Sequence, residues 1–544
     1  MRAAVLPLLV VFVVPAFGQD APVPLPAREA DPAANAKNGA RQGAVYVPKP
    51  AEPNKPILRL RIEDVGRLAL RNSPRFNVSR LAPAIARTFE DEAMGEFDPL
   101  FAARATGGRD KARVFFDPSA FGPGGSSSSP DLFIQEDLLS GSAGVSATQE
   151  WGGELSFTAE TSSADRSGAT SIRSLQPRYN GLLSLGYTHP LLRGAGRDVR
   201  LSRAREAAKR TSESEDRLSR EAELTVLDAE SLYWELVGAI ADRAVLDTSL
   251  DLTRELLDVA RARFEAGRGI PADVAEAEAG LARREGEWID TQARVGNLSD
   301  RLRELVMPFE GRGSSLALTI LPVDVPADDL DELPPEPDRE TLEVALRQRT
   351  DVRATRAALD AAKQAELRAQ NEEDFELNAL LTGGLRGYGS GFSQASEDWR
   401  DRDDYVWEAG LELAIPIGNI TATARLRRAE RQTQQAQREL VALRNSVVRE
   451  IREAVRNTRS AVDRIRAAKR ERVATEAQLQ AEQSRLEKGK STPFRVLEKE
   501  EDHSRAIARE IRARVDLETA RAALASALGS LLVERNLRAL AVGE

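Results

Sequence analysis

The chain has 544 residues and a formal net charge of −9, and 30% of its residues are charged, with acidic and basic side chains interleaved along the sequence. This interleaving argues against a surface that binds nucleic acid. The sequence contains no cysteine, which excludes disulfide bonds, thiolate metal sites, a cysteine nucleophile and a lipid attached through cysteine.

The N-terminal segment MRAAVLPLLVVFVVPAFG combines the basic Arg2, an apolar run and a small-residue step. The run of roughly 13 to 15 apolar residues is too short to span a bilayer, which takes about 20. We therefore expect residues 1–18 to be a cleaved signal peptide and the protein to be exported. Residues 19–57 form a proline-rich segment, and no later stretch is apolar for long enough to predict a transmembrane helix.

An internal repeat organises the remaining sequence. Residues 65–108 and 341–384 align without a gap and agree at about 14 of 44 positions. Two further segments, RARFEAGRGIPADVAEAE from Arg261 and QSRLEKGKSTPFRVLEKE from Gln483, share the pattern R-x-E-x-G-x-x-x-P-x-x-V-x-E. We interpret the two halves as one duplicated unit, built from a helix, strands and a long helical hairpin.

The first unit extends over residues 58–310. Its helical periodicity predicts one helix from about Ile62 to Met94, followed by strands at about 98–190. A long helical hairpin is then expected at about 200–307, with its tip at Gly267.

The second unit extends over residues 341–535 and repeats this order. A linker at residues 311–340 precedes it, and its first helix is expected from about Leu342 to Gln370. Strands follow at about 376–416, and a second helical hairpin follows at about 425–533, with its tip at position 489.

Both hairpins turn at a glycine. Gly267 and Gly489 supply a C-terminal helix stop, and Pro271 and Pro493 suit the first turn of the returning helix. The helix before each tip is some 60 residues long, on the order of 90 to 100 Å. Residues spaced by threes and fours predict coiled-coil seams on these helices. The two seams are Leu246, Leu250, Thr253, Leu257, Ala260 and Phe264, and Val448, Ile451, Val455, Thr458, Val462 and Ile465.

The strand segments alternate between apolar and polar residues. Glu408, Gly410 and Glu412 lie on the face opposite to the apolar side chains. Segments of about 9 to 11 residues with one apolar and one polar face are what a membrane β-barrel strand requires. A half-buried sheet of a soluble protein has the same period, so the alternation alone leaves both alternatives open. In a barrel, the residues expected to face lipid are Leu183, Leu185, Tyr187, Trp407, Leu411 and Leu413.

The first unit is longer than the second, because the offset between them falls from 276 at Gly108 to 222 at Gly267, a difference of 54 residues. The excess contains FGPGGSSSSPD, a flexible linker by composition, and a candidate hairpin at residues 143–162. This hairpin either lengthens the sheet or adds two strands to a barrel wall, and the sequence leaves both possibilities open.

Catalytic patterns are missing from the sequence. It has two histidines, His189 and His503, which lie far apart, and it has no nucleophile elbow, phosphate-binding loop or metal-ligand cluster. We therefore expect no enzymatic activity, no cofactor and no metal site.

The order of these segments resembles the TolC-like outer-membrane efflux proteins, the exit ducts of bacterial efflux pumps and type I secretion systems. The resemblance rests on the duplicated unit, on FDP at Phe97, on PLLRG and PIGNI after the returning strands, and on the two glycine tips. It implies a mainly α fold with a β-barrel part: a homotrimer with one outer-membrane β-barrel and a periplasmic α-helical tunnel. For the tips, it implies contact with a periplasmic adaptor protein and a closing iris. The tip residues singled out for this role are Arg263, Gly267, Asp273, Arg485, Gly489, Arg495 and Glu498.

The resemblance implies a passive exit duct that works with the adaptor and, through it, with an inner-membrane transporter. The protein would then lie in lipid of the bacterial outer membrane, with its helices in the periplasm. Charges at hairpin ends usually only solvate a turn, but the same motif in two diverged copies favours a shared task. One departure concerns the second tip, where Arg495 stands in place of an expected acid. The alternative function is a secreted periplasmic coiled-coil scaffold or adaptor without a pore.

Overall fold

The computed structural model describes residues 57–114, 132–168, 179–307, 319–326, 333–389, 394–395, 397 and 404–538. The chain divides into two units, residues 1–47 and 48–544, and every element below belongs to the second unit. The expected signal peptide, the FGPGGSSSSPD linker and much of the expected 311–340 linker lie outside the described residues.

The N-terminal helical segment is broken into three helices. They are α1 (Ile62–Asn72), α2 (Pro74–Ser79) and α3 (Leu81–Met94), so the prediction of one continuous helix is wrong. The first break falls at Ser73, whose backbone is extended because a following proline disfavours the helical conformation. The Ser73 hydroxyl accepts a hydrogen bond from the backbone N–H of Phe76 and so caps α2.

The corresponding segment of the second half is also broken. Helix α7 (Arg339–Gln348) and helix α8 (Thr350–Glu372) are separated by Arg349, which has an extended backbone. No proline explains this break. Instead, the Arg349 side chain is almost fully buried and donates to Asp351, to Glu450 and to the carbonyl oxygen of Ala527. These tertiary contacts stabilise the interruption.

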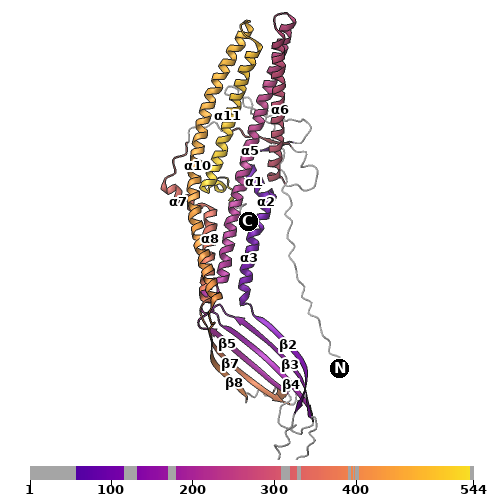
Figure 1. Cartoon of the computed structure of the whole chain (residues 1–544), viewed down its shortest axis with the longest axis vertical. Helices are drawn as coiled ribbons and strands as arrows, with labels where there is room; N and C mark the ends of the chain where they lie inside the picture. The colour runs from indigo at the N-terminus through magenta and orange to yellow at the C-terminus, as the bar shows by residue number, and fades with distance from the viewer. Residues whose placement is uncertain are drawn as a thin grey trace, which may run out of the picture. The chain divides into compact units, whose positions relative to one another are not determined.

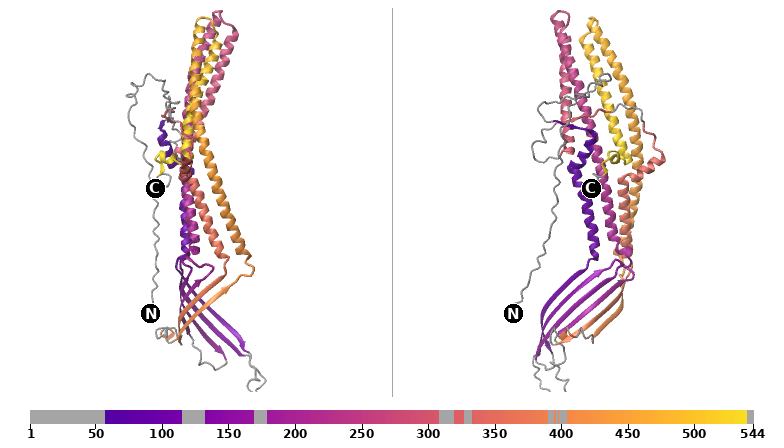
Figure 2. Two further views of the ribbon diagram at one scale, coloured as in Figure 1. Left: turned by 90° about the vertical axis from the view of Figure 1, so that its left-hand side faces the viewer. Right: turned by 180° about the vertical axis from the view of Figure 1, so that it is seen from behind.

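Two long helical hairpins account for most of the helical structure (Figure 1). The first consists of α5 (Ser202–Glu265) and α6 (Pro271–Val306), and the second of α10 (Ile420–Glu487) and α11 (Pro493–Leu528). Both tips lie at the end of the helices away from the sheet (Figure 2). Helix α11 ends at Leu528, before Gly529, whose φ is +75°, and so it ends five residues earlier than 533, the end expected for the hairpin. None of the helices in the described ranges is long and apolar enough to cross a membrane.

The predicted seams bury their central positions. Leu250, Thr253, Leu257 and Ala260 are buried on α5, whereas Phe264 at the end of that seam remains 45% exposed. On α10, the buried seam residues are Ile451, Val455, Thr458, Val462 and Ile465. Narrow stripes of this kind hold helices together in a thin layer rather than around a wide core.

A small parallel sheet anchors the first half to the segment between the halves. Strand β1 (Ile57–Leu60) pairs with β6 (Thr319–Pro322). The hydroxyl of Tyr233 on α5 donates to a carboxylate oxygen of Asp324 at 2.6 Å, and burial followed by this hydrogen bond raises the pKa of Tyr233 well above its usual value. The side chain of Tyr233 thus ties α5 to the end of β6.

Within the described residues, the main sheet has six antiparallel strands in the order β2-β3-β4-β5-β7-β8. They are β2 (Leu100–Val114), β3 (Leu132–Thr148), β4 (Glu154–Gly168), β5 (Tyr179–Pro190), β7 (Glu376–Gly389) and β8 (Tyr405–Ala414). The candidate hairpin at 143–162 belongs to β3 and β4, so it adds strands to this same sheet. Pairing of β5 with β7 joins the two halves of the chain.

Candidate functional site

The first hairpin tip is a glycine-terminated helix end. Gly267 has a φ of +63°, and its N–H donates to the carbonyl oxygen of Phe264 at 3.0 Å. The N–H of Arg268 donates to the carbonyl oxygen of Arg263 at 2.8 Å, which completes a Schellman motif. A Cβ atom added to Gly267 would meet nothing within 4 Å, so the need for glycine is one of backbone conformation alone.

The second tip repeats this geometry. Gly489 has a φ of +70°, its N–H donates to Leu486 O at 3.0 Å, and Lys490 N–H donates to Arg485 O at 2.8 Å. The space around Gly489 is also open. The shared motif therefore specifies the same reversal of the chain in both hairpins.

The side chains that close the two tips differ. In the first, Asp273 stands in the first turn of α6 and accepts a hydrogen bond from the N–H of Ile270. In the second, Ser491 donates to Glu482, and this hydrogen bond lowers the pKa of that carboxyl, as does the guanidinium of Arg485. The second tip is thus closed by a hydroxyl and a carboxylate rather than by an aspartate cap.

Among the singled-out tip residues, one reaches across to the other hairpin. The Arg263 guanidinium donates to the carbonyl oxygen of Leu486 at 3.1 Å. Arg495 and Glu498 are exposed on α11, and Glu498 lies 3.6 Å from the ammonium group of Lys499. The structure therefore brings Arg263 to the second tip and leaves Arg495 and Glu498 at the surface of the chain.

Sequence reasoning missed a second link between the hairpins. The guanidinium of Arg284 on α6 lies 3.4 Å from a carboxylate oxygen of Glu500 on α11, and both side chains are buried. Ser504 donates to the other oxygen of Glu500 at 2.6 Å. Next to this pair, a Cβ on Gly280 would come within 2.5 Å of Leu497, so α6 and α11 approach closely there. The sequence signal that could have indicated this contact is Gly280, a glycine inside a helical pattern. The ion pair itself joins residues 216 positions apart, so no local pattern indicates it.

The register of the main sheet puts the six residues predicted to face lipid on one face. Directly opposed residues of an antiparallel pair share a face, and Leu185 opposes Phe157 and Gly383, which in turn opposes Trp407. By the same rule, Leu183, Tyr187, Leu411 and Leu413 join this face. Further apolar members are Phe101, Val145, Leu155, Leu381 and Leu385.

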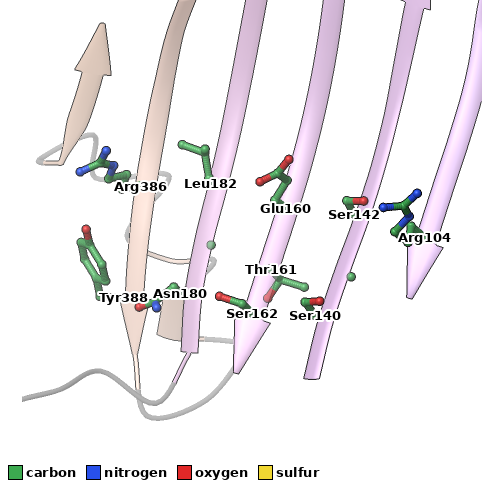
Figure 3. A pocket seen from close by; sticks show the side chains of 12 residues that line it. Arg104, Ser140, Ser142, Glu160, Thr161, Ser162, Asn180, Leu182, Arg386 and Tyr388 are labelled. Carbon is green, nitrogen blue, oxygen red and sulfur yellow. The ribbon is translucent and has the colours of Figure 1, made fainter. Parts of the chain in front are cut away.

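The opposite face of the sheet is polar and contains a cavity of about 410 Å³ (Figure 3). Arg104, Glu160 and Arg386 lie in one row across the strands, and all three side chains are exposed. Other side chains of this face in the lining are those of Ser140, Ser142, Ser162, Asn180, Leu182 and Tyr388. Charged and hydroxyl groups lining a cavity suit an aqueous, ion-bearing space.

Aromatic side chains mark the helix-proximal end of the apolar face. Trp151, in the turn between β3 and β4, donates from its indole nitrogen to the hydroxyl of Tyr187 at 3.2 Å. The same hydroxyl lies 3.2 Å from Nδ1 of His189. A Cβ on Gly153 would come within 2.4 Å of the Tyr187 hydroxyl, so only glycine leaves room for this cluster. Within the described residues, no group of three or more acidic or histidine side chains is placed to hold a metal ion.

Known proteins share this architecture. The chain superposes on the outer-membrane channel OprN with a TM-score of 0.62 at 18% identity, covering 86% of this chain and 90% of that one. The Campylobacter jejuni CmeC outer membrane channel gives a TM-score of 0.62 at 13% identity, with 86% of each chain covered. The Vibrio cholerae outer membrane protein VceC gives 0.59 at 16% identity, covering 86% of this chain and 96% of that one. Similarity at these identities establishes the fold.

Sequence comparison adds a family assignment for the second half. No curated protein sequence matches the chain. Residues 341–530 match the family model described as outer membrane efflux protein. Residues 341–530 are thus similar in sequence to the outer membrane efflux proteins, and the chain as a whole shares the fold of outer-membrane channels such as OprN.

Proposed function

We propose that the protein is the outer-membrane exit duct of a tripartite efflux pump or a type I secretion system, and that it acts as a passive conduit. The observation that carries this proposal is a sheet with one apolar and one polar face, joined to two long helical hairpins in the fold of OprN and CmeC. The pore-less scaffold finds no support, because both of these relatives are outer-membrane channels.

The apolar face is proposed to contact lipid. Tyr179 and Tyr187 lie on this face of β5, and the distance from one to the other, eight residue steps, is about 26 Å along a strand. With a tilt of about 40°, this corresponds to a band of about 20 Å, close to the roughly 25 Å apolar band of outer-membrane barrels. Trp151 and Tyr187 would then mark one membrane interface, and Tyr405 and Trp407 would lie toward the other.

Barrel closure is proposed to require three copies. Six strands from one chain are too few to enclose an aqueous channel, and three copies would supply about 18 strands. In this assembly, β2 of one copy pairs with β8 of the next. Leu81, Ile85 and Phe89 form an exposed apolar stripe on α3. Contact with a neighbouring copy on that side would remove this stripe from water.

The proposal includes the domain organisation expected from the sequence, with two repeats of one structural unit. Its parts are a signal peptide at 1–18, a proline-rich segment at 19–57, repeats at 58–310 and 341–535, and an equatorial linker at 311–340. The helices would lie in the periplasm, with the tips against an adaptor protein and, through it, an inner-membrane transporter. Transport energy would come from these partners, so the duct itself requires no catalytic group or cofactor.

The direct test combines assembly with conduction. Purified protein in detergent is expected to have the mass of a trimer and to form ion-conducting pores in planar bilayers. Extraction from cell envelopes should require detergent and should fail with salt or an alkaline wash. A monomer that leaves the envelope with salt and conducts no current would contradict the proposal.

A further inference from the structure

The helical layer next to the main sheet ends in a different helix on each side. Helix α3 packs against α5, α5 against α8, and α8 against α10, so α3 and α10 border the layer at opposite edges (Figure 1). The sheet has matching edges, because β2 follows α3 along the chain and β8 precedes α10. When β2 of one copy pairs with β8 of the next, α10 and the neighbouring α3 are therefore brought side by side.

The free face of α10 is basic in the half of the helix that is nearer to the sheet. Leu440 belongs to one apolar cluster with Leu359 of α8, and the helical period places Arg427, Arg431 and Arg438 on the opposite side of α10. All three arginines are exposed, and in the described part of the chain none of them has an ion-pair partner. We call these three residues the basic face of α10.

The free edge of α3 is acidic where the helix approaches the sheet. Ala93 belongs to one apolar cluster with Ala204 of α5, and the side of α3 away from this contact carries Asp91 and Glu92. Asp91 is exposed and has no ion-pair partner among the described residues. Glu92 lies 3.6 Å from Arg203, yet its side chain is 64% exposed. Asp91 and Glu92 are the acidic edge of α3.

The two helices are spaced equally from their strands. Six positions separate the last residue of α3 from the first residue of β2, and six separate the last residue of β8 from the first residue of α10. Asp91 is three positions from the end of α3, and Arg427 is seven positions from the start of α10, a difference of about 6 Å along the helices. Side chains lean toward the N-terminus of their helix, so Arg427 leans toward the sheet and Asp91 leans away from it. The two charges would therefore converge across the β2–β8 junction.

A groove on α10 lies at the level of the apolar stripe of α3. The groove is a cavity of about 430 Å³, and among the described residues only those of α10 line it, from Arg431 to Ala442. Leu81, which is 60% exposed, lies 13 positions from the end of α3, and Arg431 lies 11 positions from the start of α10. The stripe would thus meet the groove and the aliphatic parts of its arginine side chains.

On the basis of the proposed trimeric duct, we propose that the basic face of α10 binds the acidic edge of α3 from a second copy of this chain, and that these charges select which edges join. Residues 420–438 contain five arginines and one glutamate, whereas residues 81–98 contain five acidic side chains and one arginine. Pairing two α10 edges, or two α3 edges, would place like charges together, which is costly at an interface. Only unlike edges build a closed ring, so the charges favour ring closure.

The test is charge reversal followed by rescue, with the trimer fraction in mild detergent measured by analytical ultracentrifugation. Arg427→Glu with Arg431→Glu should lower the trimer fraction about fivefold or more, because the same repulsion enters all three interfaces. Asp91→Arg with Glu92→Arg should have the same effect. All four substitutions in one chain restore opposite charges across each interface, and this variant should recover most of the trimer.

The matched control is Lys488→Glu with Lys490→Glu, which reverses two exposed lysines beyond the far end of α10 and should leave the trimer fraction unchanged. A wild-type trimer fraction in both reversed pairs, or no recovery in the fourfold variant, would overturn the pairing of α10 with α3 and would leave the trimeric duct in place. A monomeric wild-type chain would instead contradict the proposed function itself.

Discussion

The guanidinium of Arg263 donates a 3.1 Å hydrogen bond to the carbonyl oxygen of Leu486, 223 positions further along the chain. This contact joins the tip of the first hairpin to the last turn of α10. With the buried Arg284–Glu500 pair, it holds the two hairpins together near their free ends. In a duct that closes at its tips, contacts of this kind would set how readily the end opens.

Replacing Arg263 by glutamine should loosen the tips without unfolding the protein. One partly exposed hydrogen bond contributes only about 0.5 to 1.5 kcal/mol, which the long helices can lose. We expect a several-fold increase in single-channel conductance in planar bilayers and an unchanged thermal midpoint. The control is Arg268→Gln, because Arg268 is an exposed arginine of the same tip. Equal conductance of the two variants would show that Arg263 does not control closure of the tip.

Replacing Gly267 and Gly489 together by valine should abolish export while leaving assembly intact. Both glycines have positive φ, which costs a residue with a Cβ roughly 1 kcal/mol or more, but the surrounding space is open. The shape offered to a partner therefore changes, whereas folding survives. Export and outer-membrane abundance are measured together, with Gly286→Val as the control, since Gly286 lies in α6 with open space around it. Full export by the double variant would show that the tips are ordinary turns with no role in export.

Truncating Glu500 to alanine should destabilise the helical hairpins. Arg284 would keep its contact with Glu287 at 2.7 Å but would lose its buried partner on α11. Removing one member of a buried pair costs on the order of 3 kcal/mol, so the thermal midpoint should fall by several degrees. Glu501→Ala, which breaks the more exposed pairs with Arg283 and Arg505, should cost less, on the order of 1 kcal/mol. A midpoint equal in both variants would show that the buried pair is not stabilising.

Arginine at Leu183 should block membrane insertion, whereas arginine at the neighbouring Ser184 should be tolerated. Leu183 lies on the apolar face, midway between Tyr179 and Tyr187, and Ser184 lies on the polar face of the same strand. A lipid-facing arginine near the bilayer midplane costs about 2 to 4 kcal/mol, and one facing a water-filled lumen avoids this cost. The amount of heat-stable trimer in outer-membrane fractions measures the effect. Equal amounts of the two variants would argue against a sheet in lipid.

The sequence by itself determined the helix ends and the strand faces, because each of these depends on only a few neighbouring residues. Gly267 and Gly489 end their helices because an L side chain disfavours positive φ, and Pro271 and Pro493 begin the next helix. The alternation around Leu185 assigned faces to the strands, because side chains along a strand point to opposite sides. These features hold whatever the chain packs against.

Tertiary structure alone decided the features that join distant residues. The break at Arg349 depends on acceptors from α10 and α11, and the Arg284–Glu500 pair depends on the close approach of α6 to α11 at Gly280. The placement of β3 and β4 within the main sheet, which the sequence left open, depends on strand pairing across the whole sheet. Propensity and periodicity act over one or two turns of helix, whereas these contacts depend on the packing of elements hundreds of residues apart.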